Sequence, residues 1–249
     1  MKRPKKKRRV RNIPFNKIVP NMITSGNVLC GVFSLIMTYQ RHFIPSAVLL
    51  ILAVFFDYMD GKVARSLGGS SAFGEELDSL ADALSFGAAP AFLIYAKYID
   101  IGGGMPGVLA TAFFALCGVL RLARFNVTHV KGSFQGLPIP AAGMALASLI
   151  IGGIPLTPII ASAVMTALGV LMISAIPYGN LKLLRKSNVN KVKSLVIAAV
   201  MMSCIVILRE KSLMAMIGIY IASGLLRFNW GAWLAINPEV EEEPAHEKE

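Results

Sequence analysis

Four aspartates lie within 26 residues of an otherwise apolar part of the chain. They are Asp57, Asp60, Asp78 and Asp82, and the 249-residue sequence contains one further aspartate, Asp100. The members of each pair are three or four residues apart, which places both carboxylates on one face of a helix. A charged side chain at the centre of a membrane helix costs about 2.5–3.5 kcal/mol or more, so a functional role is the default interpretation.

The spacing of the two pairs predicts a metal site that acts on phosphate. A short polar turn near residues 66–72 separates them, so two antiparallel helices would bring both pairs about 5–12 Å into the protein. Carboxylates that face one another at one depth repel unless cations lie between them. Mg²⁺ is usually held by a few carboxylates together with substrate phosphates. Two such metals about 4 Å apart can clamp a phosphoryl group.

Small and cationic residues surround the aspartates. Gly61 directly follows Asp60 and leaves room for a pyrophosphate to approach the backbone. Ala64 and Gly74 are similarly small, and the guanidinium of Arg65 has the fork geometry that suits phosphate. These neighbours favour a phosphate-binding site over a bare cation site.

Two other interpretations of the acidic pairs remain open. They could be structural ion-pair partners of inner-face cations such as Lys62 and Arg65, although few buried cations are available for four aspartates. They could also bind ions in a divalent-cation transporter. A transporter predicts acids or broken helices on further spans, and the remaining apolar runs carry no acid.

The composition is that of a membrane protein. The chain is 55% hydrophobic and 16% charged, with a mean hydropathy of +0.62, which is too apolar for an ordinary soluble domain. A membrane span needs about 20 mostly apolar residues. We therefore predict an all-α integral membrane protein with a bundle of six to eight transmembrane helices, and eight is the best count. The candidate segments are 20–39, 44–65, 75–96, 105–121, 138–154, 156–177, 194–208 and 212–230.

The charges predict the orientation of this bundle. Residues 1–17 carry nine basic residues and no acid, and residues 237–249 carry six glutamates and one lysine. With eight spans, 21 of the 25 Lys and Arg residues fall on the side of the N-terminus, so both termini should be cytoplasmic. The expected division is a basic cytoplasmic tail (1–17), a transmembrane domain (18–232) and an acidic cytoplasmic tail (233–249). The basic tail is either attracted to anionic lipid headgroups or a topology signal, and no nucleic-acid partner is expected.

The pattern around the aspartates resembles a family signature. Asp57-x-x-Asp60-Gly61-x-x-Ala64-Arg65, eight residues and Gly74-x-x-x-Asp78-x-x-x-Asp82 is similar to the complete signature of the CDP-alcohol phosphatidyltransferases. The resemblance implies two divalent cations, Mg²⁺ or Mn²⁺ with Ca²⁺ possible, bound by the four aspartates, with Asp82 also acting as general base. It also implies a set of residues that contact the CDP-lipid: Thr24, Asn27, Asp60, Gly61, Ala64, Arg65, Ser71 and Gly74.

Three further segments resemble the integral-membrane phosphatidylserine synthase branch of that family. They are the stretch from Pro20 to Gly31, the segment RLARFN at 121–126 and the segment FQGLPIPAAG at 134–143. Thr24 and Asn27, three apart on the first span, could equally hydrogen-bond a neighbouring helix or a cytosine edge. The resemblance implies transfer of a phosphatidyl group from CDP-diacylglycerol to L-serine, giving phosphatidylserine and CMP. It also implies a homodimer in the cytoplasmic membrane with its active site facing the cytoplasm.

Serine is a zwitterion, so its site should offer a cation for the carboxylate. The candidates are Arg121 and Arg124 at the inner end of the fourth span and Asn126 in the cytoplasmic loop that follows, although the arginines could instead anchor that helix at the membrane surface. Glycerol 3-phosphate and an inositol phosphate are alternative acceptors within the family. Both are phosphorylated and would call for more basic residues around the site.

Overall fold

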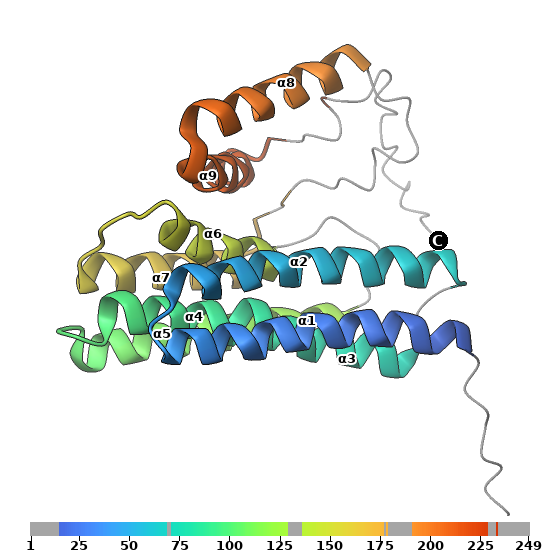
Figure 1. Ribbon diagram of the computed structural model, residues 1–249, viewed down its shortest axis with the longest axis horizontal. Coiled ribbons are helices and arrows are strands. Elements are labelled where there is room, and N and C mark those ends of the chain that lie inside the picture. Colours follow the sequence, from blue (N-terminus) through green and yellow to red (C-terminus); the bar gives the residue numbers. More distant parts are fainter. Residues whose placement is uncertain are drawn as a thin grey trace, which may run out of the picture.

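The structure is all-helical, as predicted from the sequence. The computed structural model describes residues 15–68, 71–128, 136–176, 178, 191–228 and 233, and every regular element in these ranges is a helix (Figure 1). In chain order the elements are α1 (Phe15–Tyr39), α2 (Phe43–Ser66), α3 (Ala72–Asp82), η1 (Ala83–Ala88), α4 (Ala89–Ile94), η2 (Tyr95–Ile99), α5 (Gly104–Thr128), α6 (Ile139–Ile151), α7 (Pro158–Ile173), α8 (Lys191–Leu208), η4 (Arg209–Lys211) and α9 (Ser212–Leu225).

Four helical stretches are long and apolar enough to cross a membrane. They are Ile18–Tyr39, Phe43–Ser66, Ala72–Ile99 and Gly104–Val127. Each agrees closely with one of the first four predicted spans. Helices are also present at the four later predicted segments, but α6 and α7 have only 13 and 16 residues. The prediction of a multi-span membrane protein is supported, and the count of eight spans stays a prediction.

The third stretch is one continuous rod that contains two π-helical segments. α3 passes without a break into η1, then α4, then η2, and Asp82 is the last residue before η1. A π-helical turn is wider than an α-helical turn and is frequently found at functional sites. Within η1, Ser85, Phe86 and Gly87 are buried, whereas Ala83 and Leu84 are partly buried. This helical stretch therefore enters the bundle interior within one turn of the fourth aspartate.

Small and hydroxylated residues bring α1 close to its neighbours. Ser34 and Thr38 of α1 both hydrogen-bond the Ser46 hydroxyl of α2, at 2.8 and 2.7 Å, and all three residues are buried. At Gly31, any larger residue would collide with Ser85 of η1. Small residues and interhelical hydroxyl bonds are the usual means by which membrane helices pack closely.

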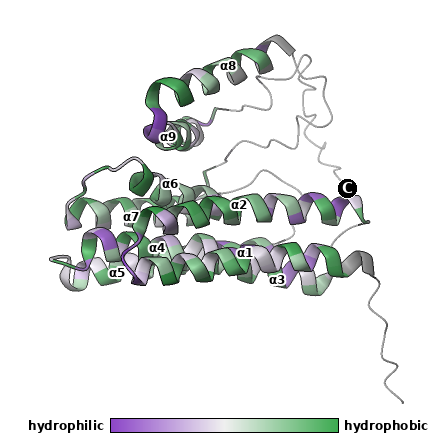
Figure 2. Cartoon of the chain, viewed as in Figure 1, coloured by the Kyte–Doolittle hydropathy of each residue, from purple (hydrophilic) through white to green (hydrophobic). Residues whose placement is uncertain are grey.

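The remaining core is apolar and lies between α4, α5, α6 and α7. Its fully buried members include Leu93, Phe114, Ile139 and Leu146. Hydropathy colouring shows largely apolar helices, with hydrophilic residues on α2 gathered towards its C-terminal end (Figure 2). The C-terminal helices α8 and α9 contact each other, and α9 also contacts α6. The polar end of α2 is where the predicted aspartate site should lie.

Candidate active site

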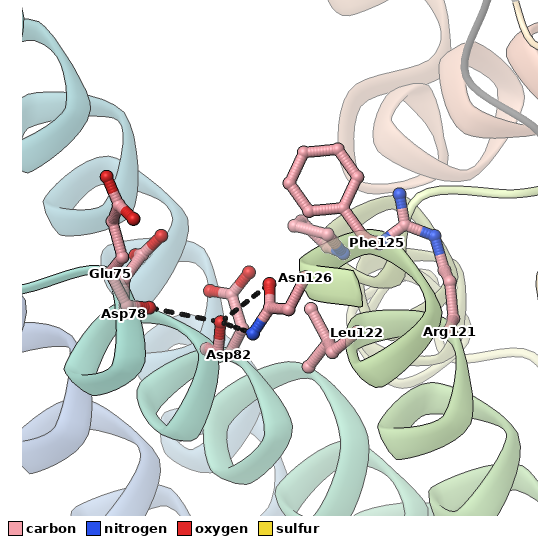
Figure 3. Close-up of a pocket in the computed structure, with 9 residues that line it drawn as sticks. Glu75, Asp78, Asp82, Arg121, Leu122, Phe125 and Asn126 are labelled. Carbon is pink, nitrogen blue, oxygen red and sulfur yellow. Dashed lines mark hydrogen bonds between the residues drawn. The ribbon is translucent and has the colours of Figure 1, made fainter. Parts of the chain in front are cut away.

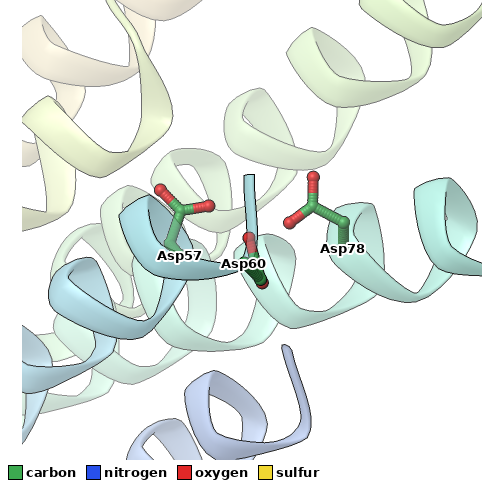
Figure 4. A group of neighbouring side chains, drawn as sticks. All are labelled: Asp57, Asp60 and Asp78. Atoms are coloured by element: carbon green, nitrogen blue, oxygen red, sulfur yellow. The ribbon is translucent and has the colours of Figure 1, made fainter. Parts of the chain in front are cut away.

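Three of the four aspartates form a compact cluster. Asp57 and Asp60 project from α2, and Asp78 projects from α3 (Figure 4). One carboxylate oxygen from each lies within 4.8 Å of the others. Asp60 is buried, with 5% of its surface exposed, and the other two are half-buried. The sequence prediction that these two helices bring their carboxylates together at one depth is confirmed for these three residues.

The hairpin between α2 and α3 produces this arrangement. The last turn of α2 closes with the Leu67 N–H donating to the Val63 and Ala64 carbonyls. Gly68 follows with a φ of +96°, a left-handed conformation that glycine adopts without strain. Ser71 then caps α3 by accepting a hydrogen bond of 3.1 Å from the Gly74 N–H. α2 ends at Ser66 and α3 begins at Ala72, and both helices pack against α1, so that Asp78 meets Asp57 and Asp60.

The donor set of this cluster fits a hard divalent cation. Asp60 Oδ2, Asp78 Oδ1 and Asp82 Oδ1 are buried and have no hydrogen-bond partner among the described residues. Within the same part of the chain, no lysine or arginine forms an ion pair with any of the four aspartates. Two carboxylates 4.8 Å apart repel by about 3 kcal/mol at an effective dielectric constant near 20. Cations with oxygen ligands would satisfy the buried oxygens and remove this repulsion.

A cavity of about 420 Å³ adjoins the cluster between α3 and α5 (Figure 3). Asp78 is a member of both the cluster and the cavity wall. A hydrogen bond of 3.0 Å from Asn126 Nδ2 to Ser79 Oγ links α5 to α3. The residues that line the cavity are Glu75, Asp78, Ser79, Asp82, Arg121, Leu122, Phe125, Asn126 and Pro140.

Asp82 belongs to the cavity rather than to the three-carboxylate cluster. It lies one helical turn beyond Asp78, and its carboxylate interacts electrostatically with the other three aspartates and with Arg121. The sequence prediction made it both a metal ligand and a base. The geometry separates three clustered carboxylates from a fourth that is directed towards the cavity, and the roles themselves stay predictions.

The two predicted serine-site arginines are in different environments. Arg121 lines the cavity, and its Nε atom is buried without a hydrogen-bond partner among the described residues. Arg124, three residues later on α5, is exposed and is not part of the cavity wall. Asn126 does line the cavity, although its side-chain amide hydrogen-bonds Ser79. Of the two arginines, only Arg121 lines this cavity within the described part of the chain, and the serine-binding roles of both stay predictions.

The two polar residues predicted on α1 are buried near the cluster. The Thr24 hydroxyl donates to the Pro20 carbonyl at 3.0 Å and also lies beside the Asp60 carboxylate. Asn27 is fully buried, and both polar atoms of its side-chain amide lack a partner among the described residues. Its backbone carbonyl accepts a hydrogen bond from Ser85. A buried amide without partners is rare in a folded protein and calls for an explanation such as a bound ligand.

Close packing explains the small residue at one of the predicted phosphate-site positions of α2 and α3 but not at another. Gly74 lies against the Asn21 side chain, so a Cβ there would come within 2.8 Å of Asn21 Oδ1. A Cβ at Gly61 would meet nothing within 4 Å. Arg65 folds back over this point, with its Nε donating to the Gly61 carbonyl at 2.7 Å. Packing explains Gly74, whereas Gly61 leaves an open surface beside the cluster. Ala64, the remaining small residue of this set, is buried.

Sequence reasoning missed several residues of the cavity wall. It considered charged groups and small neighbours, and therefore passed over Ser79, Leu122 and Phe125. The signal that would have found two of them is helical spacing. Ser79 is three residues before Asp82, and Phe125 is four after Arg121, so each shares a helix face with a predicted site residue.

Comparison with known proteins identifies the family to which these elements belong. The family model described as CDP-alcohol phosphatidyltransferase matches residues 17–203, which include the aspartate cluster and the cavity wall. The chain belongs to the CDP-alcohol phosphatidyltransferase family. The resemblance inferred from the sequence motif is thereby confirmed.

Curated members of this family that resemble the chain have names that refer to serine. The CDP-diacylglycerol–serine O-phosphatidyltransferase of Helicobacter pylori is 30% identical over 87% of this chain and 94% of its own length. The enzyme of the same name from Bacillus subtilis is 39% identical over 66% of this chain and 91% of its own length. The archaetidylserine synthase of Methanothermobacter thermautotrophicus is 39% identical over 64% of this chain and 69% of its own length.

A solved structure of another family member is a more distant match. Phosphatidylinositol phosphate synthase from Mycobacterium tuberculosis, with CDP-DAG bound, is 24% identical and aligns with a TM-score of 0.49. The alignment covers 62% of this chain and 80% of that one. This likeness is too distant to assign an acceptor.

Proposed function

We propose that this protein is a metal-dependent membrane transferase that moves a phosphatidyl group from CDP-diacylglycerol to L-serine, producing phosphatidylserine and CMP. The observation that carries this proposal is that Asp78 belongs both to the aspartate cluster and to the cavity wall. It joins a three-carboxylate cluster suited to divalent cations to a cavity that contains a carboxylate and a guanidinium. The names of the curated relatives support serine as the acceptor.

The donor, CDP-diacylglycerol, would bind between α1 and the C-terminal end of α2. Asn27 has an unpartnered buried amide that suits the polar edge of a cytosine. Gly61 lets a pyrophosphate approach the helix backbone, and the guanidinium of Arg65 lies directly beside it. Mg²⁺ or Mn²⁺ held by Asp57, Asp60 and Asp78 would neutralise the pyrophosphate and stabilise the departing CMP oxygen. Thr24, next to Asp60, would complete the donor side.

The acceptor would bind in the cavity between α3 and α5. Arg121 offers a cation for the serine carboxylate, and the carboxylates in the cavity wall suit its ammonium group. A phosphorylated acceptor such as glycerol 3-phosphate is disfavoured because the described residues of the wall include three carboxylates and one guanidinium. Arg124 lies outside this wall, so we assign the carboxylate contact to Arg121 alone.

Asp82 would act as the general base. Its Oδ1 atom is buried and has no hydrogen-bond partner among the described residues, so it is available to accept a proton. The serine hydroxyl loses its proton to Asp82 as its oxygen forms a bond to the lipid-linked phosphorus. The bond from that phosphorus to the CMP oxygen breaks, and CMP leaves with the electron pair.

We further propose a cytoplasmic-membrane location, with the site and both chain termini on the cytoplasmic side and eight helices crossing the bilayer. The distribution of basic residues supports this orientation. On this view residues 1–17 and 233–249 are solvated tails that flank the transferase domain, 18–232, and they lie largely outside the described residues. A homodimer is proposed on family resemblance alone.

An acceptor screen tests the function directly. The purified protein in nanodiscs would receive CDP-diacylglycerol, Mg²⁺ or Mn²⁺ and one acceptor at a time, and CMP release would be followed. We expect release with L-serine and little with glycerol 3-phosphate or an inositol phosphate. Release with a phosphorylated acceptor and none with serine would contradict the proposed function.

A further inference from the structure

The cavity arginine is flanked by α9 on the side away from the aspartates. The Arg121 guanidinium interacts electrostatically with Asp82 of α3 and with Tyr220 of α9. In Figure 3 the Arg121 side chain extends from α5 towards the faint orange ribbons of the C-terminal helices. Helix α9 therefore contributes to the surroundings of Arg121. This contribution is separate from the family match, because α9 begins at Ser212 and the matched region ends at residue 203.

A second tyrosine, Tyr178, packs against the Tyr220 ring. The rings of Tyr178 and Tyr220 pack at a centroid distance of 5.7 Å, with an angle of 39° between their planes. Tyr178 is 1% exposed. Its ring lies against Gly224, one turn along α9 from Tyr220, where any added side chain would collide with it. The glycine is thus required for the two rings to meet.

Two buried polar atoms in this group lack partners. Neither Arg121 Nε nor the Tyr178 hydroxyl has a hydrogen-bond partner among the described residues. A buried donor without a partner is costly, so simple packing does not account for such groups. Apolar residues at 178 and 220 would fill the same space at lower cost. The two phenols beside Arg121 therefore favour a role towards its guanidinium.

We propose that Tyr220, supported by Tyr178, positions the Arg121 guanidinium for the carboxylate of the acceptor, and that α9 thereby contributes to acceptor specificity. Tyr220 acts through Arg121 and is a positioning residue. The inference rests on the proposed function, since it concerns the acceptor side of the same cavity.

Two variants of α9 test this role with matched controls. Tyr220→Phe keeps the ring and removes the hydroxyl, and Tyr39→Phe makes the same change at an exposed position on α1. Gly224→Ala displaces the Tyr178 ring, whereas Gly218→Ala adds a methyl group on the same helix where nothing lies within 4 Å. We expect Tyr220→Phe and Gly224→Ala to raise the KM for L-serine about tenfold, because both change the surroundings of the Arg121 guanidinium. The KM for CDP-diacylglycerol should change less than twofold, and both controls should match the wild-type protein.

A double-mutant cycle separates positioning from a general structural effect. In an Arg121→Gln background, Tyr220→Phe should have no further effect on kcat/KM for serine, because its partner is gone. An equal loss in both backgrounds, or an unchanged KM for serine in Tyr220→Phe, would overturn the positioning role. The wild-type protein distinguishes the two proposals. Absence of serine-dependent CMP release from it would refute the proposed function, whereas normal release with no effect of the variants would refute only the role of α9.

Discussion

The aspartates at the two ends of the helical bundle differ in whether they have partners. At the end that carries the α1–α2 connection, Asp100 forms an ion pair of 2.7 Å with Arg41. Arg41 also donates to the Ala96 carbonyl, and Lys97 lies 4.8 Å from the centroid of the Phe43 ring. At the other end, four aspartates have no ion pair within the described ranges, and three of them have a buried oxygen without a hydrogen-bond partner. The same residue type is satisfied at one end and left unsatisfied at the other.

Cavity size does not distinguish the two ends. The cavity beside Arg41 measures about 670 Å³ and is larger than the 420 Å³ cavity beside Asp82. Among the residues that the structure describes, its wall contains basic and aromatic side chains but no carboxylate. The end with the four aspartates differs because it buries unpaired carboxylates. Burying an unpaired charge is unfavourable, so such residues indicate a functional site. The contrast therefore depends on chemistry, and single substitutions can test it.

The largest expected effect is that of Asp82→Asn. Removing a general base lowers turnover by about 10²–10⁴-fold, so we expect CMP release to fall by about a thousandfold. Binding of the CDP-lipid, measured as a ligand-induced shift in Tm, should be largely retained because the three-carboxylate cluster is intact. Unimpaired turnover would exclude Asp82 as the base.

Asp57→Asn should weaken the metal dependence itself. One of three clustered carboxylates is neutralised, so we expect at least about a hundredfold loss of activity at a fixed low Mn²⁺ concentration. Part of this loss should be recovered as the Mn²⁺ concentration is raised. A metal titration identical to that of the wild-type protein would contradict the cluster as the metal site.

Arg121→Gln should act on the acceptor more than on the donor. The guanidinium–carboxylate contact is worth about 1.5–3 kcal/mol as a charged hydrogen bond, which corresponds to a rise of roughly 10–100-fold in the KM for serine. Arg124→Gln, on the exposed side of α5, should change that KM by less than threefold. Equal effects of the two substitutions would show that the cavity does not define the serine site.

Gly61→Ala should separate ligand binding from stability. A glycine inside a helix is about 1 kcal/mol less favourable than alanine, and a Cβ at this position meets no atom within 4 Å. We expect an equal or higher Tm together with a rise of about tenfold in the KM for CDP-diacylglycerol. An unchanged KM would mean that the donor does not approach this part of the helix.

The smallest effect is expected at the paired aspartate. Asp100→Asn breaks a partly exposed ion pair, and such pairs contribute about 0–1 kcal/mol to stability. CMP release should stay within twofold of the wild-type rate, which makes this substitution the control for Asp57→Asn and Asp82→Asn. A loss as large as theirs would remove the distinction between the two ends.

Much of this organisation was predictable from the sequence because it depends on short-range spacing. The spacing of Asp57 and Asp60, and of Asp78 and Asp82, fixes which side chains share a helix face. The short connection between α2 and α3 then allows Asp78 to meet Asp57 and Asp60. The four strongest spans were also predictable, since length and apolar composition decide them.

The rest depended on contacts between distant segments. The π-helical turn after Asp82 has no marker in the local sequence, yet it governs where the following residues enter the core. The different surroundings of Arg121 and Arg124 follow from the cavity between α3 and α5, which Arg121 lines. The approach of Tyr220 to Arg121 joins residues 99 positions apart. No local pattern encodes such a contact.

The most direct test of the central claim is CMP release from CDP-diacylglycerol by the purified protein, measured before and after removal of divalent cations. With L-serine present, we predict that EDTA abolishes release, that Mn²⁺ or Mg²⁺ restores it, and that phosphatidylserine forms in equal amount. Release that persists after chelation would contradict the metal-dependent site. Flux of divalent cations through proteoliposomes without CDP-lipid, in the absence of any transfer, would contradict the assignment of the four aspartates to transfer chemistry.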